Sequence, residues 1–137
     1  MGSLATLLNH AVSDVIGMHQ TDHECLDLLD WAEPLTAGEI AGHLGLSSGA
    51  VTGLIDRLEA GGWVERRRDP TDRRRVYVYA VHEKGAELWP LYQPLAEALD
   101  RYCDELSDAE LEVIVRFLEF ANATIADSTE RIRRRRS

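Results

Sequence analysis

Residues 35–62 read LTAGEIAGHLGLSSGAVTGLIDRLEAGG, and this stretch decides the fold. Thr36 and Glu39 have the spacing of a capping box, in which each side chain accepts a free backbone N–H at a helix start. The short helix that begins there is expected to end at Gly45, because glycine tolerates the left-handed backbone of a helix end. Ser47 follows almost at once and is expected to cap a second helix, which closes at Gly61-Gly62.

The second helix of this stretch has one apolar face. Its apolar side chains recur at the i, i+3, i+4, i+7 spacing of a helix that packs on one side, at Val51, Leu54, Ile55 and Leu58. A short helix, a tight glycine turn and a capped amphipathic helix are together typical of a helix-turn-helix.

A β-hairpin is expected directly after the second helix. Residues 63–66 and 76–79 are rich in β-formers and predict two strands. The loop between them, residues 67–75, is polar, turn-prone and cationic. A hairpin with an arginine-rich tip behind a helix-turn-helix predicts a wing.

Helices are expected on both sides of this region. Helical spacing of apolar residues predicts helices at 4–19 and 21–31, and again at about 83–103 and 107–130. Ser107 and Glu110 repeat the capping-box spacing. Pro90 and Pro94 should bend the helix at 83–103 or shift its start, since each removes a backbone donor. The sequence therefore predicts a mainly α fold with a small β-hairpin wing, a winged helix-turn-helix.

The composition suits a single compact domain. The 137 residues are 45% hydrophobic, which is enough for a packed core. No apolar run is long enough to span a membrane, and the first residues lack the pattern of a signal peptide. Cys25 and Cys103 lie far apart inside helical patterns, which indicates reduced, buried thiols in a cytoplasmic protein and neither a disulfide nor a zinc site.

The net charge of −9 is unusual for a protein that binds nucleic acid. The positive charge is concentrated, however, because seven arginines lie between residues 57 and 75. A local cationic patch can hold phosphates while the acidic remainder faces away and suppresses indiscriminate binding. The arginine run at 131–137 is expected to be a disordered basic tail.

The stretch from Leu35 to Gly85 resembles the MarR family of bacterial winged-helix regulators. The resemblance is carried by Leu35-Thr36, Glu39-Ile40-Ala41, Leu44-Gly45-Leu46-Ser47, Ala50-Val51-Thr52, Ile55-Asp56-Arg57-Leu58-Glu59, Gly61-Gly62-Trp63-Val64-Glu65-Arg66, Asp69-Pro70-Thr71-Asp72-Arg73-Arg74-Arg75-Val76 and Glu83-Lys84-Gly85. It implies a single MarR-like domain in which residues 34–82 form the DNA-binding lobe, and 1–33 and 83–130 form dimerisation helices. It also implies a homodimer that reads a pseudo-palindromic operator and is released by a small molecule or an oxidant.

A recognition helix contacts bases mainly through its N-terminal residues. Here those positions are all small or hydroxylic: Ser47, Ser48, Gly49, Thr52 and Gly53. Small residues let the helix backbone enter the major groove, and the Thr52 hydroxyl can donate or accept at a base edge. The alternative is that the small residues serve only a tight contact between helices.

Several arginines are candidates for phosphate contacts. Arg57 suits a phosphate, with a surface ion pair to Asp56 or Glu59 as the alternative. The resemblance implies that Arg74 enters the minor groove while Asp72 shapes the turn. Phosphates are then expected at Arg73, Arg75 and Arg66–Arg68. The alternative for the whole loop is a solvated charged surface.

Other signals are weaker. An effector cleft is predicted to be lined by His10, His19, Trp31, Trp89 and Tyr92, with core or interface packing as the alternative. His19 and His23 are expected to be separated by a helix start at Thr21-Asp22, so no metal site is expected. Cys25 is interpreted as a structural thiol and not as a redox sensor. No motif for catalysis or for a cofactor is found.

The sequence therefore favours a DNA-binding transcriptional regulator, a ligand-responsive repressor that binds its operator as a homodimer. Its alternative is a winged-helix protein-interaction module without DNA binding, which the acidic net charge favours. The intact run Asp72-Arg73-Arg74-Arg75 argues against that alternative.

Overall fold

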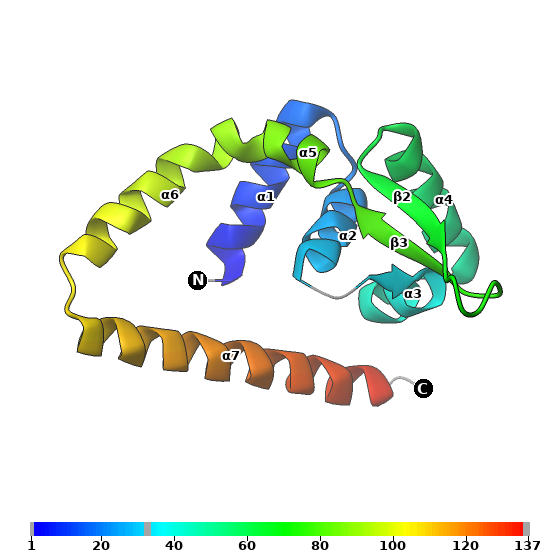
Figure 1. Cartoon of the computed structure of the whole chain (residues 1–137). Helices are drawn as coiled ribbons and strands as arrows, with labels where there is room; N and C mark the ends of the chain where they lie inside the picture. Colours follow the sequence, from blue (N-terminus) through cyan, green and yellow to red (C-terminus); the bar gives the residue numbers. More distant parts are fainter. Residues whose placement is uncertain (1, 32–33, 136–137) are drawn as a thin grey trace. The chain divides into compact units, whose positions relative to one another are not determined.

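The computed structural model describes residues 2–31 and 34–135 (Figure 1). The chain divides into two compact units, Met1–Leu91 and Tyr92–Ser137. The first unit contains α1 (Gly2–Ile16), α2 (Gln20–Trp31), α3 (Ala37–Leu44), α4 (Ser48–Ala60), the three strands, α5 (His82–Gly85) and the 3₁₀ turn η1 (Ala86–Leu88). The boundary falls within α6 (Trp89–Asp104), and α7 (Asp108–Arg134) completes the second unit.

The helix-turn-helix predicted from residues 35–62 is confirmed. Thr36 and Glu39 form the capping box at the start of α3, and Gly45 ends that helix with a left-handed φ of 68°. The side chain of Ser47 accepts the backbone N–H of Ala50 and so caps α4. Local side-chain chemistry therefore fixes both ends of the turn between the two helices.

The predicted wing is confirmed as a hairpin of β2 (Val64–Arg68) and β3 (Val76–Ala80). The strands pair antiparallel from Val64 opposite Ala80 to Arg68 opposite Val76. The sequence analysis missed a third strand, β1 (Leu35–Thr36), which pairs with the other edge of β3. Because β1 is two residues long, it shows no alternation that could have indicated it. It ties the start of α3 to the sheet.

The hydrophobic core lies in the first unit. Every residue that is buried in the described part of the chain lies between Val12 and Val78. The predicted apolar face of α4 is confirmed, because Val51, Leu54, Ile55 and Leu58 are all buried. They pack in one cluster with side chains from α2, α3 and the sheet, among them Leu26, Leu29, Ile40, Val64 and Val78.

The single helix predicted at 83–103 is instead broken into α5, η1 and α6. Pro90 lies at the second residue of α6, where a missing N–H costs nothing, so the helix restarts there as its prolines predicted. Cys103 is exposed on α6, so the expectation of a buried thiol is wrong for that cysteine. The reason is that α6 buries none of its side chains within the chain.

The last helix is longer than predicted. Its capping box at Ser107 and Glu110 is confirmed, but α7 continues to Arg134, so most of the expected basic tail is helical. Two ion pairs one helical turn apart, Arg131 to Asp127 and Arg134 to Glu130, support this extension. Residues 136 and 137 of the predicted tail lie outside the described residues. In the described part of the chain, no helix is both long and apolar enough to cross a membrane.

Candidate nucleic-acid interface

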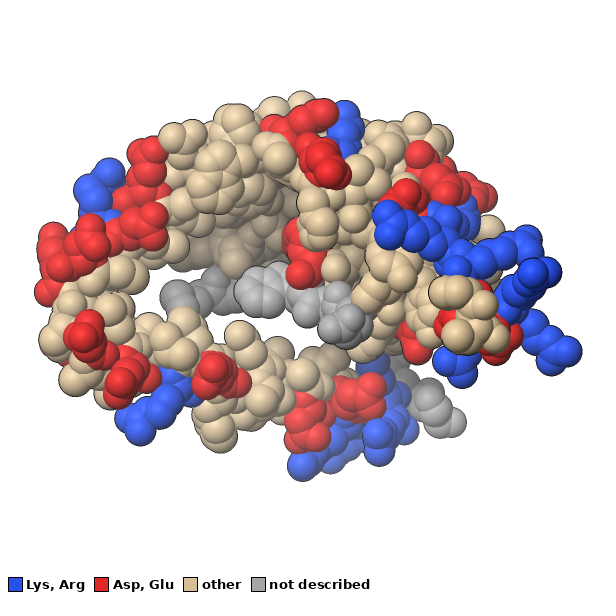
Figure 2. Space-filling view, in the orientation of Figure 1, with Lys and Arg blue, Asp and Glu red and all other residues tan. Residues whose placement is uncertain are grey.

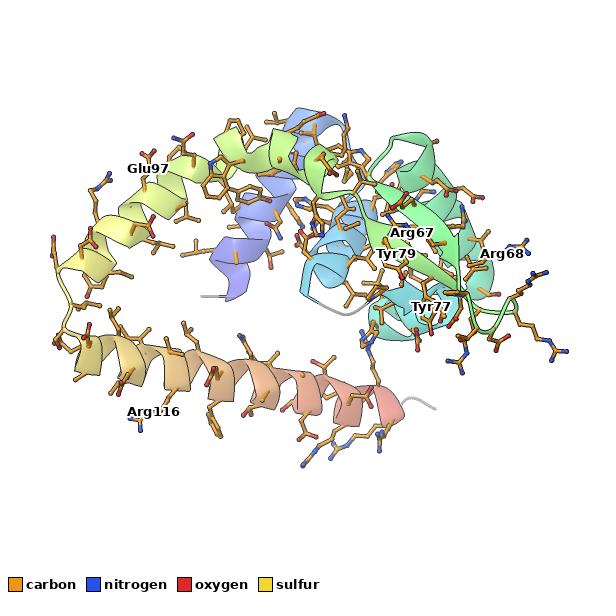
Figure 3. All side chains as sticks on the ribbon, in the orientation of Figure 1. Arg67, Arg68, Tyr77, Tyr79, Glu97 and Arg116 are labelled. Atoms are coloured by element: carbon orange, nitrogen blue, oxygen red, sulfur yellow. The ribbon has the colours of Figure 1, made fainter. Side chains whose placement is uncertain are left out.

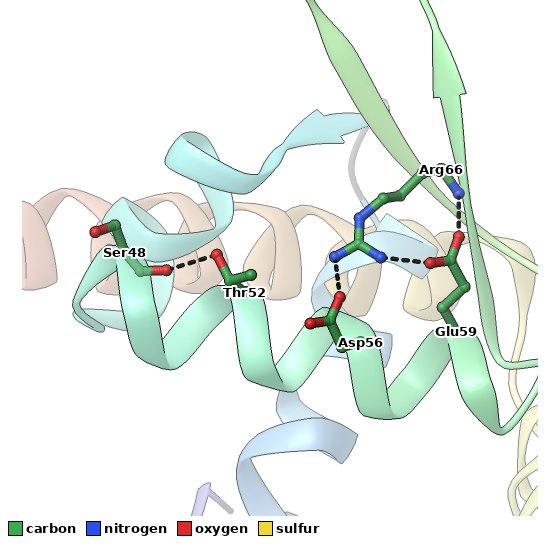
Figure 4. Close-up of polar contacts among 5 residues, drawn as sticks. All are labelled: Ser48, Thr52, Asp56, Glu59 and Arg66. Carbon is green, nitrogen blue, oxygen red and sulfur yellow. Dashed lines mark hydrogen bonds and ion pairs between the residues drawn. The ribbon is translucent and has the colours of Figure 1, made fainter.

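The N-terminal end of α4 presents polar and small groups to solvent. Ser47, Ser48, Gly49 and Thr52 are all exposed. The Thr52 hydroxyl donates to the carbonyl oxygen of Ser48 at 2.8 Å (Figure 4). Since its proton is used inside the helix, Thr52 offers lone pairs and a methyl group to a ligand, so it is suited to accept from a base amino group.

Within residues 2–31 and 34–135, the two glycines of α4 have no packing role. A Cβ on Gly49 would meet nothing within 4 Å, and one on Gly53 would meet only the end of the Arg57 side chain, at 3.8 Å. In the described part of the chain, neither glycine therefore makes the tight helix contact that was the alternative. Gly49 sits in the first turn of α4 and Gly53 in its interior, and glycine is less favourable in a helix than alanine.

Arg57 makes a contact that the sequence did not indicate. Its Nε and Nη2 donate to the two carboxylate oxygens of Asp22 on α2, at 3.0 and 2.6 Å. The surface ion pair considered for Arg57, with Asp56 or Glu59, is wrong. Asp22 is 35 residues away in the chain, so no local pattern could have found it.

The carboxylates of Asp56 and Glu59 bind Arg66 of β2 instead (Figure 4). The guanidinium of Arg66 reaches both acids, and Glu59 also accepts the backbone N–H of Arg66 at 3.1 Å. Burial has the largest single effect on the pKa of Arg66, and it lowers that pKa. The hydrogen bonds and charges of Asp56 and Glu59 together outweigh burial, so the pKa of Arg66 is raised overall. Arg66 therefore connects the hairpin to α4, and its charge is paired with Asp56 and Glu59.

Arg67 is also occupied. It pairs with Glu65 on the same strand, and its guanidinium lies 4.6 Å from the centre of the Tyr79 ring on β3 (Figure 3). This is the distance of a cation–π contact. Both neighbours hold the side chain on the face of the hairpin.

The tip of the wing is built by two aspartates. One carboxylate oxygen of Asp69 accepts the N–H and the hydroxyl of Thr71, both at 2.7 Å, and the N–H of Asp72 at 3.3 Å. These hydrogen bonds, chiefly those from Thr71, lower the pKa of Asp69. Asp72 accepts the backbone N–H of Arg74 at 3.0 Å. The loop is therefore a folded turn, and its Asp-Pro-Thr-Asp order was a signal from which Asp69 could have been predicted.

The arginines at this tip differ in how far they are engaged. In residues 2–31 and 34–135, no side chain pairs with Arg68, Arg73 or Arg74. Arg75 lies 3.9 Å from a carboxylate oxygen of Asp72, and a side-chain hydrogen bond with Tyr77 raises its pKa. Figure 2 shows basic side chains gathered around the hairpin. The wing thus offers unneutralised positive charge at its tip.

The residues predicted for an effector cleft are spread over several elements. His10 is exposed on α1, His19 is exposed just before α2, and Trp89 is exposed at the start of α6. Tyr92 is half-buried on α6, and the side chain of Trp31 lies outside the described residues. That they share a cleft stays a prediction. Cys25, by contrast, is confirmed as a buried thiol whose pKa burial raises to about 12.

Comparisons with known proteins agree on one family. The model of the MarR family matches residues 18–76. The HTH-type transcriptional regulator YcgE of Bacillus subtilis is 37% identical over 133 residues, which cover 97% of this chain and 86% of that relative. The HTH-type transcriptional regulator MhqR of the same organism is 29% identical over 75% of this chain and 71% of its own length.

Solved structures share the fold. A mutant of MepR from a multidrug-resistant clinical isolate of Staphylococcus aureus superposes with a TM-score of 0.71 at 18% identity, covering 85% of this chain and 86% of its own. The apo form of MarR from Escherichia coli superposes with a TM-score of 0.58 at 23% identity, covering 88% of this chain and 90% of its own. Together with the capped helix-turn-helix and its wing, these matches show that the chain belongs to the MarR family of winged helix-turn-helix transcriptional regulators.

Proposed function

We propose that this regulator binds duplex DNA sequence-specifically, with the N-terminal end of α4 in the major groove and the tip of the wing against the backbone and minor groove. The observation that carries the proposal is the pair of glycines on α4. Each is less favourable in a helix than alanine, and neither has a packing use in the described part of the chain, so they suit a surface that another molecule must approach closely.

The wing supplies the electrostatic part of the interface. Arg73 and Arg74 are exposed and carry no ion pair in the described chain, so their charge is available to phosphates. Asp69 and Asp72 hold the turn that projects them. Arg74 is the candidate for the minor groove, where a narrow A·T-rich stretch attracts a guanidinium. Arg73 and Arg75 are candidates for the phosphates beside it.

The proposal revises the role of Arg57. Its guanidinium is held by Asp22, so the phosphate contact expected from the sequence competes with an internal ion pair. The expected contacts of Ser47, Ser48 and Thr52 remain in the proposal, because their side chains are exposed at the end of α4.

The functional form is a homodimer built from the helices outside the winged lobe. A single chain leaves large apolar side chains exposed on α6 and α7, among them Leu95 and Leu99 on α6 and Ile114, Val115 and Leu118 on one face of α7. Contiguous apolar surface of this kind is typical of an interface between protein chains. Two winged lobes would then read the two halves of a pseudo-palindrome.

The finer role is that of a cytoplasmic repressor released by a small molecule. Membership of the family supports it, and the predicted cleft residues His10, His19, Trp31, Trp89 and Tyr92 are its candidate ligand contacts. The acidic net charge of −9 favours a second candidate, a protein-interaction module. The unpaired arginines at the wing tip favour DNA.

The experiment compares two arginines of one hairpin. Arg74→Ala removes an unpaired cation, whereas Arg67→Ala removes one that Glu65 and Tyr79 already occupy. Binding to a labelled duplex from upstream of the gene is measured by fluorescence anisotropy. We expect Arg74→Ala to weaken binding about tenfold or more, and Arg67→Ala to change it little. Equal losses would contradict the proposed role of the wing tip.

A further inference from the structure

One ion pair joins the proposed recognition helix to the helix behind it. Arg57 lies in the last turns of α4, and Asp22 lies in the first turn of α2. Two parallel hydrogen bonds, Nε to Oδ2 at 3.0 Å and Nη2 to Oδ1 at 2.6 Å, connect them. A bidentate arginine–carboxylate contact fixes orientation as well as distance. The pair therefore restrains the rotation of α4 about its own axis relative to α2.

The two partners are buried to different extents. Asp22 is only 4% exposed, whereas the Arg57 side chain is 50% exposed. A buried carboxylate without a partner is strongly unfavourable, so Asp22 depends on Arg57 more than Arg57 depends on Asp22. The position of Asp22 in the first turn of α2 adds the favourable end of a helix dipole. Arg57 therefore compensates the charge of the buried Asp22 carboxylate, and its bidentate contact does so in one defined orientation.

The pair lies beside the surface that is proposed to enter the groove. The Cβ position of Gly53 is 3.8 Å from Nη1 of Arg57, the one guanidinium nitrogen that does not bond to Asp22. Leu54, Ile55 and Leu58 of α4 pack in the core with side chains of α2 such as Leu26 and Leu29. The packing sets the depth of the helix, and the ion pair adds a directional constraint to it.

We propose that Asp22 and Arg57 form a positioning pair, which fixes the angle at which α4 is presented to DNA without either residue contacting the DNA. This inference rests on the proposed function and assigns the Arg57 guanidinium to the ion pair with Asp22 and not to a phosphate. Asp22 is buried too deeply to reach DNA, so its substitution can change binding only through Arg57 or through the orientation of α4.

A phosphate contact and a positioning pair make opposite predictions. Loss of a phosphate contact weakens binding equally on all sequences. It also reduces the slope of log affinity against log salt concentration by about one. Loss of a positioning pair tilts the reading helix, so it lowers the preference for the correct sequence and leaves the salt dependence unchanged. If Arg57 bound phosphate, Asp22→Asn would free it and binding would stay equal or become tighter.

The test is a double-mutant cycle on the full chain with Asp22→Asn, Arg57→Gln and the double variant. Each is titrated with the upstream duplex and with a scrambled duplex over a range of salt, and unfolding by urea is followed in parallel. We expect each single variant to lose about tenfold of its preference for the upstream duplex, with an unchanged salt slope. The double variant should lose no more than the worse single one. Arg57→Gln should lower the urea midpoint more than Asp22→Asn.

Arg57→Lys keeps the charge but not the bidentate geometry, so it should fold and show a smaller loss of preference. If Arg57→Gln does not fold, Arg57→Lys and Asp22→Asn are the variants that test the inference. A lower salt slope for Arg57→Gln, with normal or tighter binding by Asp22→Asn, would overturn the inference and restore the phosphate contact. Wild-type preference in every variant would also overturn it. Failure of the wild-type protein to bind the upstream duplex would instead reject the proposed function, and the inference with it.

Discussion

Two glycines on α4 stand at positions where the protein's own stability favours alanine. Their Cβ positions are open or in ordinary contact, so Gly49→Ala and Gly53→Ala should each raise the free energy of unfolding by about 0.5–1 kcal/mol. If the backbone of α4 lies deep in a groove, the same changes should weaken DNA binding roughly fivefold or more, about 1 kcal/mol. Urea unfolding and anisotropy titration measure the two effects.

Gly42→Ala on α3 is the matched control, because its Cβ position is equally open. It should stabilise the protein without the loss of DNA affinity. Stabilised α4 variants that bind DNA like the wild-type protein would contradict close approach of the helix backbone.

The thiol of Cys25 gives a second prediction at the scale of one residue. Burial raises its pKa to about 12 from 9.0, so the thiolate is disfavoured in the folded state. In a Cys103→Ser background, the native protein should react with a thiol reagent only as fast as it unfolds, even at about pH 9. Because the unfolded thiol ionises first, Cys25 should also reduce stability as the pH rises from about 9 toward 12. Rapid native labelling would contradict its burial and reopen a redox role.

At the scale of one element, the ionised form of Asp69 stabilises the turn of the wing. Its hydrogen bonds to Thr71 and Asp72 lower its pKa below the ordinary 3.8. A lowered pKa means that the turn is fully stabilised above pH 3.8 and loses this stabilisation as the pH falls through the folded-state pKa. The amide resonance of Thr71 should therefore titrate with a midpoint below 3.8 in the wild-type protein.

Asp69→Asn keeps an acceptor oxygen but no ionisation, so this titration should vanish while the turn is largely retained. A wild-type midpoint at or above 3.8 would show that the carboxylate is not held as described.

The elements also show which parts of the fold follow from local sequence. The starts of α3, α4 and α7 were predicted because Thr36, Ser47 and Ser107 carry their caps within three residues. The wing was predicted because its strands and turn are adjacent in the chain. The strand β1 and the Asp22–Arg57 pair were missed, since each depends on a partner distant in the sequence. The ion pairs of Arg66 were missed for the same reason, because Asp56 and Glu59 become its neighbours only in the folded state.

At the scale of the whole molecule, the exposed apolar faces of α6 and α7 predict that the chain does not act alone. Leu118 is one of the large apolar residues of α7 that are exposed within the single chain. Leu118→Glu should convert a dimer to a monomer in sedimentation velocity, because a buried carboxylate in an apolar interface is strongly unfavourable. The core of the first unit does not include Leu118, so the winged lobe should remain folded.

Arg116→Ala is the control on the same helix, since a residue two positions from Leu118 lies on nearly the opposite side of α7. It should leave the dimer intact. A dimer that persists in Leu118→Glu would remove α7 from the proposed interface.

The charge distribution of the whole molecule leads to the most direct test of DNA binding. The net charge of −9 disfavours binding to any polyanion, so binding must come from the arginines around the wing and from the groove-facing end of α4. The measurement is a titration of the wild-type protein, at several salt concentrations, with the duplex from upstream of its gene and with a scrambled duplex of the same composition. We predict a preference for the upstream duplex at two protomers per site, and an affinity that falls as salt rises. Equal binding to both duplexes at every salt concentration, or binding to neither, would contradict the account.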